Sequence, residues 1–223
     1  MRLILPLLFG LAGFVVLAAL GLWQLQRMEW KQGAIAEIEA RIGADPVPVA
    51  AVLDPETDNF RPVIVEGRIS GPPIRVLGAW RSAGSGFKVI VPLQTAQRTL
   101  MVDLGIVPLE TSTEALRARL PEGPIRVTGN LNWPDDLNAG TPSPEGDIWY
   151  ARDVPTLAPV MGTDPVMVVA RDVTPPAGPT PVPVGVEGIP NNHLGYAVQW
   201  FGLALVWLGM TLFLLWRIRR RTL

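Results

Sequence analysis

Two long apolar runs, one near each end of the chain, constrain the fold more than any other feature of the sequence. Residues 3–23 contain no charged side chain, and residues 196–216 contain only Gln199, Thr211 and the Tyr196 hydroxyl as polar groups. A helix through either run is roughly 31 Å long, about one hydrocarbon thickness of a bilayer. Because an α-helix satisfies its own backbone hydrogen bonds in lipid, we expect transmembrane helices at residues 1–23 and 193–216.

Positive charges beside the two runs predict how they cross the lipid bilayer. Arg2 precedes the first run, and a basic cytoplasmic tail at residues 217–223 follows the second. Positively charged flanks stay in the cytoplasm, so we expect both termini there and the main domain on the other side. The N-terminus is not rich in Arg and Ser as a mitochondrial transit peptide is. The expected location is therefore a bacterial inner membrane, with a periplasmic main domain.

A cleaved signal peptide is the alternative for the first run. Ala18 and Ala19 offer small residues for a cleavage site, and Arg2 alone supplies a positive leader. The apolar stretch is longer than the usual signal-peptide core of about 7–15 residues. The length of the run therefore favours a retained helix.

The segment between the runs is acidic. It carries all 20 Asp and Glu residues but only 14 of the 19 Lys and Arg residues, which leaves it about six units negative. A binding site for nucleic acid is not expected from such a balance. The arginines at 217–221 are better explained as topology anchors.

Hydrophobic periodicity divides the middle of the chain into three parts. We expect a helical extension of the first span at residues 24–44, with Gly43 as its stop, then a β-rich domain at 45–171 and a proline-rich linker at 172–192. Short β-type runs with Gly and Pro at their joints predict a barrel- or sandwich-like antiparallel sheet in an extracytoplasmic α+β domain. The expected strands are residues 62–69, 74–80, 87–93, 99–107, 125–131, 147–152 and 166–171.

Two short helices are expected to interrupt this sheet. Residues 111–114 read TSTE, a pattern similar to a capping box that begins with Thr111 and opens a helical turn through Leu120. Asp153 is placed to cap a second helix that ends near Met161.

Cofactor chemistry in this chain depends on a single side chain. The sequence has no cysteine and one histidine, His193, at the start of the second apolar run. A zinc site needs three or four suitable ligands, a cysteine nucleophile is excluded, and no Gly-x-Ser-x-Gly elbow or phosphate-binding glycine loop is present. We therefore expect no enzyme activity. Haem is the cofactor that one imidazole can hold.

Spacing places several candidate haem contacts near His193. His193, Tyr196 and Trp200 share a helix face with Ala197, Ala204 and Trp207 at intervals of three and four residues. On the first helix, Arg27 lies between Trp23 and Trp30, where its guanidinium could reach a propionate, and Met28 is a conceivable sulfur ligand. Simpler readings are available, because Trp and Tyr anchor membrane interfaces and an interfacial Arg can snorkel. An interfacial His can also serve only to hydrogen-bond the neighbouring Asn pair or to cap the helix.

Motifs along nearly the whole chain resemble the Surfeit locus protein family, and the chain is similar to a bacterial member of it. The end motifs carry most of this resemblance: residues 21–31 read GLWQLQRMEWK, and residues 190–204 read PNNHLGYAVQWFGLA. Further matches are residues 60–63, 86–93, 127–131 and 149–153. One motif departs from the pattern, because residues 104–108 read LGIVP where the family usually has Arg-Gly-Trp-Val-Pro.

The resemblance implies an assembly factor for haem-copper cytochrome c oxidase. Such a factor would bind haem a transiently, near haem A synthase, and aid its insertion into oxidase subunit I. The family's haem ligand matches His193, while roles for Arg27, Trp23, Trp200 and Tyr196 are hypotheses from their placement. The alternative is a membrane scaffold that stabilises subunit I during assembly without binding haem.

Overall fold

The computed structural model describes residues 3–80, 84–186 and 189–220, and the chain divides into two compact units. Residues 1–37 and 188–223 form a helical unit. Residues 38–187 form a second unit built around a β-sheet, called the barrel unit here.

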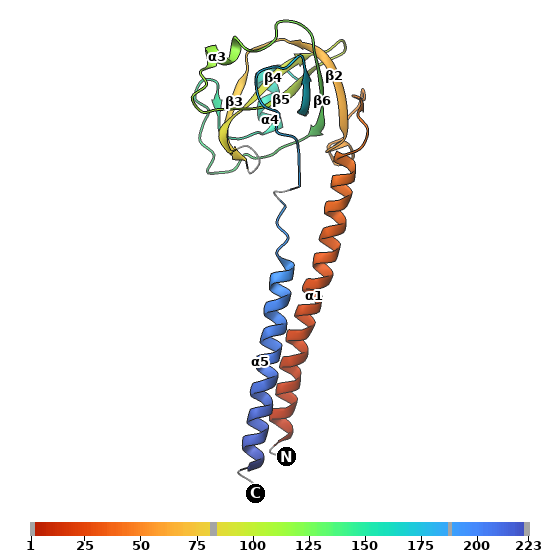
Figure 1. The fold of residues 1–223 in the computed structure, drawn as a ribbon, viewed down its shortest axis with the longest axis vertical. Coiled ribbons are helices and arrows are strands. Elements are labelled where there is room, and N and C mark those ends of the chain that lie inside the picture. The colour runs from red at the N-terminus through yellow and green to blue at the C-terminus, as the bar shows by residue number, and fades with distance from the viewer. Residues whose placement is uncertain (1–2, 81–83, 187–188, 221–223) are drawn as a thin grey trace. The chain divides into compact units, whose positions relative to one another are not determined.

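Two long antiparallel helices make up the helical unit, α1 (Ile4–Ile42) up to residue 37 and α5 (His193–Arg220) (Figure 1). Both are long and apolar enough to cross a membrane. Only 11% and 6% of the residues in their most apolar stretches are buried, so neither is the covered core helix of a soluble domain. The two long apolar terminal helices predicted from the sequence are confirmed.

Glycines on α1 let the two helices approach closely. A Cβ atom added at Gly10 would lie 2.0 Å from the Thr211 side chain, and one added at Gly21 would lie 2.7 Å from the Phe201 ring. The Trp207 indole N–H donates to the Gly10 carbonyl oxygen over 2.9 Å. Small residues at such contacts are typical of helices that associate in lipid, where packing replaces the hydrophobic effect.

The described residues of the barrel unit form eight strands and three short helices. The strands are β1 (Val47–Pro48), β2 (Pro62–Ile69), β3 (Ile74–Trp80), β4 (Gly84–Gln94), β5 (Thr99–Val107), β6 (Ile125–Asn132), β7 (Ile148–Trp149) and β8 (Met167–Thr174). The helices are α2 (Pro55–Asp58), α3 (Thr113–Arg117) and α4 (Val154–Met161). All seven strands expected from the sequence occur, although the one expected at 147–152 is only the two-residue β7. The short β1 and α2 were not anticipated.

The sheet closes on itself. Its strand order is β1-β2-β6-β8-β5-β4-β3-β7, and a further antiparallel pairing of β2 with β4 joins Arg68 to Gln94. Strands β2, β6, β8, β5 and β4 therefore form a barrel (Figure 1). Most pairings are antiparallel, as expected, but β1–β2, β3–β7 and β5–β8 are parallel. Alternation of side chains does not indicate strand direction, so the sequence pattern does not reveal these parallel pairs.

Alternate residues of the strands fill two separate cores. One is the barrel interior, whose members include Val89, Val91, Val102, Val127 and Val168, all fully buried. The other lies where Val154, Leu157 and Ala158 of α4 pack against the opposite face of β3, β4, β5 and β8. Side chains of successive strand residues point to opposite faces, which is why runs without polar residues, such as Val89 to Leu93 in β4, serve both cores.

The two predicted helix caps have different outcomes. The Asp153 side chain accepts a hydrogen bond from the Thr156 backbone N–H and caps α4, which ends at Met161 as predicted. The prediction that Thr111 caps the other helix was wrong. The Ser112 hydroxyl accepts from the Ala115 N–H instead, because the helix starts one residue later than the capping-box pattern suggests, and α3 ends at Arg117.

Part of the segment expected as a stiff proline-rich linker is packed on the barrel. Strand β8 continues to Thr174, and the backbones of Thr180 and Ile106 exchange two hydrogen bonds of 2.8 and 2.9 Å. Gly105 makes this approach possible, since it has φ +116° and an added Cβ would lie 2.0 Å from the Thr180 carbonyl oxygen. Residues 104–108 (LGIVP) differ from the usual family motif but keep its glycine. This contact requires a glycine at position 105.

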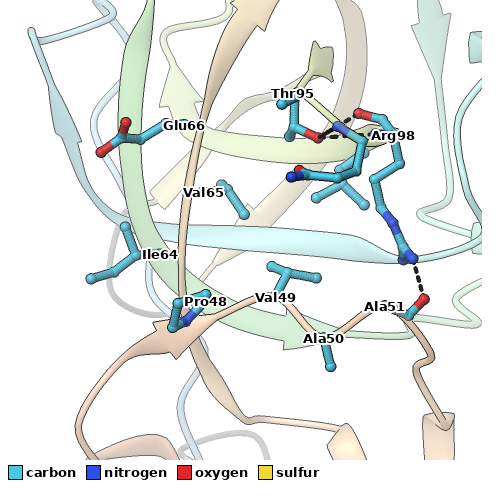
Figure 2. Close-up of a pocket in the computed structure, with 12 residues that line it drawn as sticks. Pro48, Val49, Ala50, Ala51, Ile64, Val65, Glu66, Thr95 and Arg98 are labelled. Carbon is cyan, nitrogen blue, oxygen red and sulfur yellow. Dashed lines mark hydrogen bonds between the residues drawn. The ribbon is translucent and has the colours of Figure 1, made fainter.

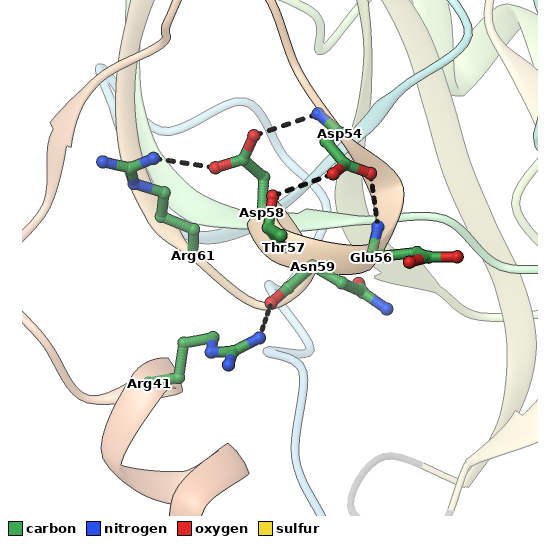
Figure 3. A network of polar contacts seen from close by, with 7 residues as sticks. All are labelled: Arg41, Asp54, Glu56, Thr57, Asp58, Asn59 and Arg61. Carbon is green, nitrogen blue, oxygen red and sulfur yellow. Dashed lines mark hydrogen bonds and ion pairs between the residues drawn. The ribbon is translucent and has the colours of Figure 1, made fainter.

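The last turn of α1 belongs to the barrel unit and is held there by polar contacts. The Ile42 carbonyl oxygen accepts hydrogen bonds from the Asn130 amide over 3.2 Å and from the Arg171 guanidinium over 3.1 Å. A cation at a helix C-terminus also favours the helix dipole. Close by, Arg61 pairs with Asp58 over 2.7 Å in a network that includes Arg41 (Figure 3).

A buried ion pair lies between neighbouring strands of the barrel. The Lys88 ammonium of β4 is 2.6 Å from the Asp103 carboxylate of β5, and their side chains are 2% and 0% exposed. The second oxygen of Asp103 accepts from the Gly105 backbone N–H over 3.0 Å. A charge pair taken out of water stays stable only with such complete hydrogen bonding.

Candidate functional site

The only histidine lies at the start of α5 and contacts a side chain of α1. The end of the helix pair formed by Trp23, Gln24, Arg27, His193 and Tyr196 is called the mouth here. His193 is the first residue of α5, and its Nδ1 atom lies 2.9 Å from the Gln24 side-chain oxygen of α1. An amide oxygen only accepts, so Nδ1 carries the proton and donates it. In the neutral ring this leaves the lone pair on Nε2, the atom that can bind a metal.

An unpartnered polar atom lies two residues before this histidine. The side-chain oxygen of Asn191 is buried, and no residue that the structure describes donates a hydrogen bond to it. Buried polar atoms in native proteins are nearly always bonded. Asn191 therefore marks the approach to His193 as a place where a donor group on a ligand would be favoured.

Aromatic side chains and one cation surround this mouth with exposed faces. Trp23 is 55% exposed and Tyr196 is 52% exposed. The Arg27 guanidinium lies 4.2 Å from the centre of the Trp30 ring, a cation–π contact that keeps the charge at the surface. These are the groups that an amphiphilic ring system would need: flat apolar faces beside a cation.

The predicted shared face of α5 serves partly as the helix contact. Ala197 and Ala204 are almost fully buried against α1, and His193 and Trp200 are half-buried. Tyr196 lies on the exposed flank of the same helix. The structure thus brings His193 to Gln24 and places Arg27 on Trp30.

Sequence reasoning missed Gln24 and Asn191. Gln24 is the first polar side chain after the apolar run of residues 3–23, and this position could have marked it. Asn191 belongs to the PNNH motif, whose Asn pair was considered only as a hydrogen-bond partner of His193 and not as a contact for a ligand.

The barrel unit offers a separate pocket of about 490 Å³ between β1, β2 and the turn before β5 (Figure 2). Its two charged residues are already engaged. Glu66 pairs with Arg126 over 2.5 Å, and Arg98 pairs with Asp164 over 3.3 Å and donates to the Ala51 carbonyl. Both charged side chains of this pocket therefore already serve the structure of the barrel unit.

Two carboxylates of the barrel unit, Asp147 and Asp58, are held in ion pairs with arginines. Burial raises the pKa of Asp147, but hydrogen bonds from Arg75 at 2.7 Å and Thr113 at 2.8 Å outweigh it and bring this pKa below its ordinary value. The pKa of Asp58 is also lowered, first by the hydrogen bond from the Asp54 backbone N–H and then by that from Arg61. A lowered pKa keeps each carboxylate charged and unsuited to acid catalysis at neutral pH.

Comparison with known proteins identifies the family. The sequence matches the SURF1 family over residues 11–205, so the chain belongs to this family, and the resemblance to Surfeit locus proteins is confirmed. The SURF1 family is one of cytochrome c oxidase assembly factors and not of enzymes. The expectation that the chain is not an enzyme is therefore confirmed.

Curated relatives come from several animals. The chain is 32% identical over 203 residues to Surfeit locus protein 1 of Rattus norvegicus, covering 81% of this chain and 66% of the relative. It is 32% identical over 204 residues to Surfeit locus protein 1 of Homo sapiens, covering 81% and 68%. A SURF1-like protein of Drosophila melanogaster is 27% identical over 210 residues, with 81% and 68% covered. The chain thus spans about two thirds of the length of these relatives.

Proposed function

We propose that this chain is a haem a carrier for the assembly of haem-copper cytochrome c oxidase, which binds haem a transiently and aids its insertion into subunit I. The observation that carries the proposal is the hydrogen bond between His193 and Gln24. It presents an imidazole nitrogen with a free lone pair, in a fixed tautomer, at the mouth of an apolar helix pair. Family membership supports the same role.

The residues around His193 fit the parts of a haem. His193 Nε2 would bind the iron, and the exposed rings of Trp23 and Tyr196, with the half-buried Trp200, would pack on the macrocycle. Arg27 would meet a propionate through a charge-assisted hydrogen bond. One protein ligand and an open flank favour release over storage, as a carrier requires.

The proposed setting is a bacterial inner membrane with both termini in the cytoplasm. The arginines at the end of α5 support this orientation. The mouth of the helix pair and the barrel unit would then face the periplasm. The proposed partners are subunit I, haem A synthase as the source of the cargo, and the lipid bilayer.

The test is the absorbance of the full-length protein purified in detergent from cells that make haem a. We expect His193→Ala to lose most of the bound haem, and added imidazole to restore part of it by occupying the vacated position. Tyr196→Phe is the matched control, since it keeps the ring and the axial ligand. Stoichiometric haem in His193→Ala would contradict the ligand assignment.

The size of the barrel unit favours a second candidate, a scaffold for subunit I. This unit has its own closed core and a pocket that is independent of His193. A scaffold predicts that the chain co-purifies with subunit I from cells unable to make haem a. A carrier predicts that this association is lost or weakened in those cells.

A further inference from the structure

A second recess lies between the two helices, away from His193. It has a volume of about 490 Å³, and its lining is entirely apolar apart from the Trp207 indole N–H, which already donates to Gly10. This apolar groove is lined by Phe9, Ala12, Gly13, Val16, Leu17, Leu203, Val206, Trp207 and Met210. The Trp207 ring packs closely on α1 at Gly13, where an added Cβ would lie 2.3 Å from the indole nitrogen.

The apolar groove continues the flank that carries the candidate haem contacts. On α1, Val16, Trp23 and Arg27 follow one another at helical spacings of seven and four residues, which keeps them on one side of the helix. On α5, Tyr196 and Leu203 are likewise seven residues apart. The groove and the site at His193 are therefore two parts of one surface of the helical unit.

Helical rise gives the separation of these two parts. Trp23 lies seven residues beyond Val16, which corresponds to roughly 10 Å along α1, and the groove itself extends roughly 12 Å from Phe9 to Leu17. A macrocycle held at His193, with its propionates toward Arg27, would direct its opposite edge toward the groove.

We propose that the apolar groove binds the isoprenoid tail of haem a. This inference rests on the proposed carrier function. Haem a bears a farnesyl-length chain on the side of the macrocycle away from its propionates, whereas haem b has no such chain. The groove provides what this chain needs: an elongated recess without unsatisfied polar atoms, lined by apolar residues of both helices. It would make the carrier selective for haems that carry the tail.

Two groove-filling variants test the proposal by titration of full-length protein in detergent with haem a and with haem b. Val206→Trp fills the groove from α5, and Val16→Trp fills it from α1. We expect each to weaken haem a binding at least tenfold and to leave haem b binding unchanged. Leu205→Trp and Val15→Trp are matched controls, because these neighbours are 68% and 54% exposed and do not line the groove. Helical circular dichroism establishes that every variant is folded.

The outcomes separate this inference from the proposed function. Equal losses for both haems, or unchanged haem a binding in both groove variants, would overturn the tail site. Loss of both haems in His193→Ala with no effect of the groove variants would leave the carrier intact and reject the groove alone. If His193→Ala retains both haems, the carrier assignment itself fails.

Discussion

The barrel unit and the helical unit are held together by different contacts. In the barrel unit the sheet closes, and the buried Lys88 and Asp103 are paired over 2.6 Å. In the helical unit the helices contact each other through glycines and single hydrogen bonds, while the Asn191 oxygen is buried without a donor among the described residues. Two buried oxygens of the barrel unit, on the side chains of Asn130 and Thr163, also have no hydrogen-bond partner among the described residues, but its buried charges are paired. The helical unit differs by its exposed aromatic side chains beside His193, which are available to a ligand.

This difference shows where binding can be reversible. A closed barrel with paired charges gains little from a new partner, since each existing contact would first have to be broken. A ligand that binds to the exposed aromatic side chains beside His193 displaces only water or lipid. We therefore expect changes in the barrel unit to act on stability, and changes around His193 to act on binding.

The largest effect is expected from breaking the buried pair of the barrel. Asp103→Ala would leave the Lys88 ammonium buried without its carboxylate and remove the acceptor of the Gly105 N–H. Such a loss lowers the free energy of unfolding by about 3–5 kcal/mol. Chemical unfolding of the full-length protein, followed by circular dichroism of the sheet, measures it.

The matched control is the exposed pair of Glu66 and Arg126, whose side chains are 60% and 63% exposed. Glu66→Ala should change the same free energy by less than about 1 kcal/mol, because solvent screens surface pairs. Equal effects of the two variants would contradict the view that the barrel depends on its buried charges.

An intermediate effect is expected at the hydrogen bond that orients His193. Gln24→Met keeps the length of the side chain but removes the acceptor, so the imidazole is no longer held in one tautomer. Losing such an orienting partner lowers affinity for a metal centre by about 10–100-fold. Haem titration measures this change, and the iron–histidine stretching frequency in the resonance Raman spectrum should fall.

Gln26→Met is the control for this prediction, since Gln26 is exposed two residues away on α1. Gln24→Glu should raise the stretching frequency, because a carboxylate accepts the Nδ1 proton more strongly. An unchanged frequency in both Gln24 variants would mean that the contact does not tune the histidine.

The smallest effect is expected from acid. Asp58 and Asp147 have lowered pKa values in the folded protein, so their contribution to stability is complete above the ordinary aspartate value of 3.8. It is lost as the pH falls below 3.8 and through the folded-state pKa values, because folding then opposes protonation. Thermal unfolding between pH 5 and pH 3 (about the range that brackets this value) tests it. In Asp147→Asn the slope with pH should be shallower.

The architecture was largely predictable because its signals are local. Apolar length determines the two terminal helices, and β-type runs such as residues 62–69 and 99–107 match β2 and β5 at both ends. Strand order and direction were not predictable, since the contact of β5 with β8 joins residues more than 60 positions apart. The composition of the proline-rich segment predicts a stiff, extended linker but does not reveal the pairing of Thr180 with Ile106.

Only half of the candidate site follows from the sequence. His193 stands out because it is the only histidine and the chain lacks cysteine. Its partner Gln24 lies 169 positions away, and only the packing of α1 on α5 brings the two side chains together. Long-range hydrogen bonds of this kind leave no periodicity in the sequence.

Closure of the sheet also affects how copies of this protein behave beside one another. Open sheet edges can pair with the edges of other molecules and start aggregation. Here the end strands of the sheet, β1 and β7, are only two residues long, and Pro48 removes one backbone donor from β1. Pairing between copies through β1 or β7 is thus disfavoured.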